Sequence, residues 1–154
     1  MASGVDVAAL VQRYSLRHFA DSENTVYYSL DDDVLIAVPH EGSRDTGSSA
    51  HSNREVQVRY FRGKGKKGGV IIFFDRMTSQ DKDARKIYEG MDDALTCSAL
   101  VGGSMLTRAM FSFFLGISRP RVPVKLFGDV ESALRWIRDM NERADRAVDK
   151  RAAA

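Results

Sequence analysis

An uninterrupted apolar run, Val70–Phe74 (VIIFF), constrains the fold of this chain more than any other stretch. The run is short for a helix and has no polar residue for a solvent-facing side, so it predicts a strand covered on both faces. A polar turn follows, and residues 80–92 then place apolar side chains three and four positions apart, which predicts a helix. A buried strand followed by a helix is typical of a parallel sheet built with crossover connections.

The same alternation continues toward the C-terminus. Residues 97–103 predict a second buried strand, 104–117 a helix with a wide apolar face, and 124–129 a short strand. Asp129 stands where an N-cap would begin a helix over 130–148, and the last residues, 149–154, are expected to fray.

The N-terminal third has a different pattern. Residues 5–19 carry apolar side chains at helical spacing and predict an amphipathic helix, with His18 on its face. Residues 26–30 and 34–38 predict a β-hairpin. The aspartates between them form a solvated turn rather than a metal site, because adjacent side chains splay apart.

Residues 42–52 are small and polar and predict a loop. Residues 53–62 are ambiguous, since Val56 and Val58 alternate as in a strand, whereas Ser52 could cap a helix.

Together these segments predict an α/β sandwich. An N-terminal β-hairpin is joined to a mainly parallel sheet of four or five strands with helices, and an extra helix precedes it. The chain of 154 residues is expected to hold a helical extension (1–22), one α/β domain (23–141), and a charged helix end with a tail (142–154).

Composition excludes several classes of protein. A net charge of +2 is too small to indicate a nucleic-acid partner. Tyr60 and Phe61 interrupt the basic stretch 59–67 and are expected in the core, which leaves its lysines as a solvated connector. The single cysteine, Cys97, excludes an internal disulfide or a multi-cysteine zinc site, and we expect it buried. Without a secretory signal pattern or a run of about 20 apolar residues, we expect a cytoplasmic protein with no membrane span.

Catalytic motifs are incomplete, so we expect no enzyme, cofactor or metal. Ser104 follows a strand and opens a helix, but Leu106 stands where a nucleophile elbow needs its second glycine. An enzyme using Ser104 or Asp75 would need one of the three histidines within hydrogen-bond reach.

Two hydroxyls follow the central strand in the turn DRMTSQD. Thr78 lies three residues before Asp81, which fits a capping box, so we predict Thr78 as the N-cap. Ser79 would then be the first helical residue, where a phosphate would face free N–H groups.

The stretch VIIFFDRMTSQDKDARKIYEG, followed by CSALVGGSMLTRAMFSFFLGISRPRVPVKLFGDVESALRWI, resembles the STAS superfamily, in particular its SpoIIAA-like (STAS/SEC14-like) bacterial branch. The resemblance covers roughly residues 25–140. It implies helices mainly on one face of the sheet, a helix over 53–62, and no intrinsic enzymatic activity. Anti-sigma-factor antagonists of this superfamily are switched by phosphorylation at the position that Ser79 occupies. Ser79 lacks their flanking acidic residue and glycine.

Two functional hypotheses follow. The first is a non-catalytic regulatory module that binds a protein partner, with a recognition surface made of Asp75, Arg76, Thr78, Ser79 and Ser104. The second is a module that binds a small apolar ligand or lipid. The Phe- and Met-rich helix would form a homodimer face in the first case and line a pocket in the second. Its candidate residues are Met110, Phe111, Phe113 and Phe114.

Overall fold

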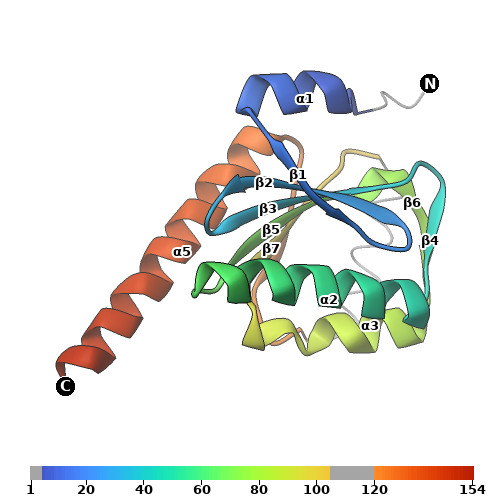
Figure 1. Ribbon diagram of the computed structural model, residues 1–154. Helices are drawn as coiled ribbons and strands as arrows, with labels where there is room; N and C mark the ends of the chain where they lie inside the picture. The colour runs from blue at the N-terminus through green and yellow to red at the C-terminus, as the bar shows by residue number, and fades with distance from the viewer. Residues whose placement is uncertain (1–4, 105–119) are drawn as a thin grey trace.

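The structure, a computed structural model, describes residues 5–104 and 120–154. Its central element is β5 (Gly68–Phe73), which lies inside a six-stranded sheet of order β1-β2-β3-β5-β7-β8 (Figure 1). The other strands of this sheet are β1 (Arg17–Asp21), β2 (Thr25–Asp31), β3 (Val34–Pro39), β7 (Leu95–Val101) and β8 (Val124–Phe127).

The sheet is mixed. β1, β2 and β3 pair antiparallel, whereas β3, β5, β7 and β8 pair parallel. The predicted hairpin, the buried strands and the α/β class are therefore confirmed. A short parallel pair, β4 (Ser43–Asp45) with β6 (Met77–Gln80), stands apart from the main sheet.

Helices cover both faces of the sheet (Figure 1). The side chains of β3 alternate, so that Val34 and Ile36 pack in one apolar cluster and Leu35 and Ala37 in the other. The first cluster includes residues of α1 (Val7–Tyr14) and α5 (Val130–Ala153). The second includes residues of α2 (Gly47–Lys64), and α3 (Lys82–Glu89) packs beside α2. The resemblance implied helices mainly on one face of the sheet. The structure differs because the parallel strands carry apolar side chains on both faces, and each face is covered by helices.

The helix predicted over 5–19 is wrong beyond residue 14. Ser15 takes a left-handed conformation (φ 53°) and caps α1, with its N–H donating to Gln12 O. Residues 17–21 then pair with β2 as an edge strand, which raises the strand number above the predicted four or five. Pairing with a neighbouring strand overrides the helical spacing here.

The loop predicted over 42–52 is also wrong for most of its length. Thr46 and Ser49 form a reciprocal capping box, in which Thr46 Oγ1 accepts from Ser49 N and Ser49 Oγ accepts from Thr46 N. Serine and glycine therefore begin a helix here, and α2 contains the predicted helix 53–62, which is confirmed. At the other end of the chain, α5 continues to Ala153 instead of fraying at 149.

Candidate functional site

A small pocket lies on the α2 and α3 side of the sheet, toward the carboxyl ends of β3 and β5. Its volume is about 70 Å³. In α/β folds the carboxyl end of a parallel sheet is the usual place for a ligand. Pro39 and Ile72 line the pocket near these strand ends, and Pro120, Val122 and Val124 line it from the start of β8 and the segment before it.

Most of the pocket wall is apolar. Phe74, Met77 and Leu100 form a buried cluster of their own beside the main core. Met91 and Leu95 extend the wall under α2. Such a wall favours an apolar body, because burying each methylene contributes about 0.8 kcal/mol.

The polar part of the wall is organised around Asn53 of α2, which is buried. Its Oδ1 accepts from the Tyr27 hydroxyl (2.9 Å) and Ser22 Oγ (2.6 Å). Its Nδ2 donates to Asn24 Oδ1 and to the Tyr88 hydroxyl, both at 3.0 Å. All four hydrogen-bonding positions of this amide are therefore occupied, so Asn53 fixes the arrangement of β2, α2 and α3.

The two tyrosines of this network are held as neutral phenols. Burial raises the pKa of Tyr27 far above its usual value, more than the hydrogen bond from Gln57 lowers it. Burial also raises the pKa of Tyr88, and the negative charge of Asp45 raises it further. Both hydroxyls therefore serve as hydrogen-bonding groups of the pocket and carry no charge near neutral pH.

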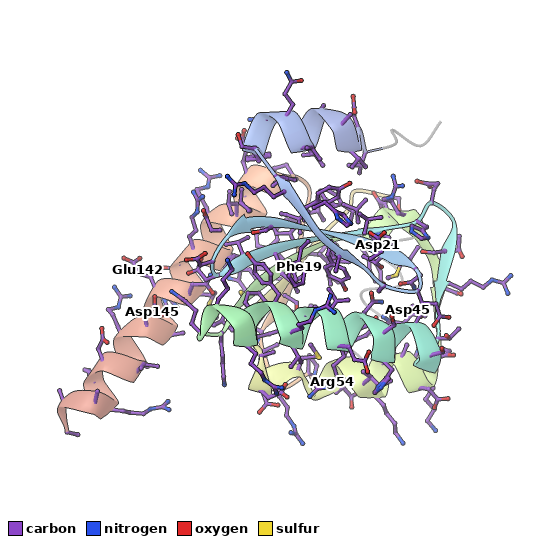
Figure 2. All side chains as sticks on the ribbon, viewed as in Figure 1. Phe19, Asp21, Asp45, Arg54, Glu142 and Asp145 are labelled. Atoms are coloured by element: carbon purple, nitrogen blue, oxygen red, sulfur yellow. The ribbon has the colours of Figure 1, made fainter. Side chains whose placement is uncertain are left out.

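Asp45 is the only acidic side chain among the described residues that line the pocket. It closes β4, immediately before the capping residue of α2, and only 2% of its surface is exposed. One carboxylate oxygen accepts from Ser49 Oγ (2.6 Å) and the other from Gln80 Nε2 (3.3 Å). Figure 2 shows Asp45 at the N-terminal end of α2.

The residues predicted as a recognition surface lie next to this pocket. Asp75 and Ser104 are brought together, since Asp75 accepts from Ser104 Oγ (2.8 Å) and from Gly103 N (3.0 Å). Arg76 donates from Nε to Pro39 O (2.5 Å) and pairs with Glu41. Arg76 therefore ties the turn after β5 to the end of β3.

The predicted capping role of Thr78 is wrong. Asp81 is the N-cap of α3, since its Oδ1 accepts from Ala84 N at 2.8 Å. Thr78 and Ser79 instead lie exposed in β6, where Thr78 Oγ1 donates to Ser43 O (3.1 Å) and Ser79 is in register with Arg44. Ser79 is consequently outside the helix, and a phosphate there would not face the N–H groups of α3.

The four residues proposed for a dimer or ligand face, Met110, Phe111, Phe113 and Phe114, lie outside the described residues. Cys97 is buried as predicted, and burial raises the pKa of its thiol to about 11. Val56, Tyr60 and Phe61 are core residues, also as predicted.

Two of the three histidines contact carboxylates on β1 and α2. His18 contacts Asp21 on β1 and His51 contacts Glu55 on α2. In residues 5–104 and 120–154, no hydrogen bond joins a histidine to Asp75 or Ser104. Within the same ranges no cluster of three metal-ligating side chains occurs, and no helix is long and apolar enough to cross a bilayer.

Sequence reasoning missed Asp45, Asn53 and Tyr88. Asp45 and Asn53 lie in or beside the stretch predicted as a loop, and Tyr88 lies within the helix predicted over 80–92. The one available signal was the motif DTGSS at 45–49, which has the composition of a helix N-terminus.

Fold and pocket together define a mixed α/β domain with a small, largely apolar pocket beside a buried polar network. The chain belongs to the family described as domain of unknown function (DUF7793), whose model matches residues 28–141. The matched range contains Asp45, Asn53 and Tyr88. Searches among curated proteins and among solved structures give no match.

Proposed function

We propose that this chain is a non-catalytic module that binds a small, mostly apolar molecule in the pocket between the sheet and α2/α3. The observation that carries the proposal is the pocket itself, an apolar wall that converges on a few fixed polar groups. This combination is the usual form of a small-molecule site, in which the wall supplies affinity and the polar groups set orientation.

Pre-organisation supports the same function. Asn53, Tyr27 and Gln57 are fully buried and hold one another by hydrogen bonds, so the polar side of the pocket needs little rearrangement when a molecule enters. A volume of about 70 Å³ suits a molecule, or one end of a molecule, with only a few non-hydrogen atoms.

Native mass spectrometry of the freshly purified chain tests this function. We expect a co-purifying small molecule, or binding of added small apolar probes seen as methyl shifts of Met77 and Met91 in NMR spectra. Val124→Phe should abolish binding by filling the pocket from an edge strand. Val148→Phe is the matched control, since Val148 is 61% exposed on α5. Equal binding by both variants would place the ligand elsewhere and end the proposal.

A second candidate function is a STAS-like regulatory module that binds a protein partner. It is favoured by the exposed hydroxyls of Thr78 and Ser79 on the short strand β6, beside Arg76. Phosphosite mapping on protein from the native host, with Ser79→Ala as control, tests the switch. Unmodified Ser79 in the presence of an active kinase of the anti-sigma type would exclude the phosphorylation switch.

Light scattering after size exclusion tests the homodimer, which a clean monomer at high concentration would exclude.

A further inference from the structure

The charge of Asp45 is not matched by a cation among the residues that the structure describes. Only 2% of the surface of Asp45 is exposed to solvent. No lysine, arginine or histidine in the described part of the chain forms an ion pair with it. Buried carboxylates in proteins are normally paired, because removing a lone charge from water is costly.

The hydrogen bonds of Asp45 leave acceptor capacity unused. A carboxylate offers about four lone-pair positions. Side chains of the described residues donate to Asp45 from Ser49 Oγ at 2.6 Å and from Gln80 Nε2 at 3.3 Å. The Tyr88 hydroxyl, whose pKa is raised by burial, by the charge of Asp45 and by its hydrogen bond to Asp45, is a third and neutral donor, which leaves one position.

The buried amides and the Tyr27 phenol of the pocket are engaged with one another. Asn53 makes four hydrogen bonds, and the Tyr27 hydroxyl donates to Asn53 while accepting from Gln57 Nε2 (3.0 Å). Asp45 is therefore the carboxylate of the pocket that offers a bound molecule a spare acceptor position.

The surrounding backbone favours a negative charge at this place. Asp45 directly precedes the N-cap of α2, a helix of 18 residues, and its carbonyl oxygen accepts from Asp81 N at the start of α3 (2.9 Å). The N-terminal end of a helix carries a partial positive charge that stabilises a carboxylate. The N-terminal end of α2 therefore stabilises the carboxylate of Asp45 but does not serve as a counter-ion.

We propose that the pocket selects molecules that carry a protonated amine, with the ammonium group on the Asp45 carboxylate and the alkyl body against Met77, Phe74 and Leu100. This inference rests on the proposed function, since it names the chemical class of the ligand of that same pocket. An ammonium group suits the site better than a metal ion, because Asp45 is the only acidic ligand among the described residues lining it. An apolar body attached to the cation matches the rest of the wall.

The test compares three probes of equal length: n-butylammonium, 1-butanol and n-butyrate. Dissociation constants are measured by NMR titration at constant ionic strength, with the methyl groups of Met77 and Met91 as reporters. We expect n-butylammonium to bind about 10- to 100-fold more tightly than 1-butanol, the range for a hydrogen bond between charged groups. Butyrate should not bind measurably.

Two variants locate the preference. Asp45→Asn should reduce the affinity for n-butylammonium to that for 1-butanol, while 1-butanol binding is unchanged. Ser49→Ala retains the carboxylate and should retain the preference. If Asp45→Asn does not fold, the order of the three probes on the natural chain still decides the matter.

The outcomes separate the inference from the function on which it rests. Equal binding of n-butylammonium and 1-butanol would overturn the ammonium assignment and leave a ligand pocket. Tighter binding of butyrate would overturn it equally. Absence of methyl shifts with all three probes would overturn both.

Discussion

Replacing Asn53 with aspartate is the sharpest test of the polar network that positions the pocket. The two side chains have the same shape, so Asn53→Asp creates no cavity and changes only hydrogen bonding and charge. The two donor bonds of Nδ2, to Asn24 Oδ1 and to the Tyr88 hydroxyl, are lost. Each buried group left without its partner costs about 1–3 kcal/mol. We therefore expect the free energy of unfolding at pH 7 to fall by about 2–6 kcal/mol, a large part of a typical total.

The loss should depend on pH in a direction that follows from burial. Position 53 is 4% exposed and lines the same pocket as Asp45, and both conditions raise the pKa of an introduced carboxyl. The unfolded chain releases this proton near pH 4, whereas the folded chain retains it to higher pH. The destabilisation relative to the natural chain is therefore smallest below pH 4. It grows as pH rises toward the folded-state pKa, above which it is complete.

Urea unfolding at pH 4 and pH 7 measures both effects, followed by circular dichroism and by fluorescence of the single tryptophan, Trp136, which packs against Phe127. Gln12→Glu is the control, because it makes the same amide-to-acid change at an exposed position on α1 and should shift stability by less than about 0.5 kcal/mol. If Asn53→Asp loses less than about 1 kcal/mol at pH 7, or loses the same at both pH values, the reasoning about this network is wrong.

Three further predictions concern the core and the surface. Gly68→Ala would place a Cβ 2.4 Å from the backbone oxygen of Asp33 and should lower the free energy of unfolding by about 1–3 kcal/mol or more. Gly63→Ala, which meets nothing within 4 Å on α2, should raise it by about 0.5–1 kcal/mol, and two destabilised variants would contradict the packing argument. Cys97 should react with a thiol reagent far more slowly in the native chain than in urea, because the thiol is buried and its pKa is raised to about 11; fast native labelling would contradict this. The Arg54 guanidinium lowers the pKa of Asp93, so this pair stabilises the fold above the ordinary carboxyl pKa and ceases to do so as pH falls. Asp93→Asn should therefore cost about 0.2–1 kcal/mol at pH 7, since the side chains are partly exposed, and nothing at pH 2; an equal cost at both would refute the ion pair.

The local sequence was enough to predict those elements whose residue pattern is compatible with only one secondary structure. Val70–Phe74 has no polar side, which predicts a strand buried on both faces, and all of it but Phe74 lies in β5. Asp129 precedes a long amphipathic stretch without a competing cap, and its side chain accepts from Ser132 N as predicted. Tyr60, Phe61 and Cys97 are buried because no solvated alternative suits them.

Only the tertiary structure decided between Thr78 and Asp81 as the start of α3. Both residues are good N-caps, so local chemistry does not choose. Pairing of Met77–Gln80 with Ser43–Asp45 draws Thr78 into a strand and moves the helix start to Asp81. The pocket depends on the same event, because this pairing also buries Asp45 under Gln80 and Ser49. A polar residue in a small, polar stretch carries no local sign of burial, and its partners come from segments that only the fold brings together.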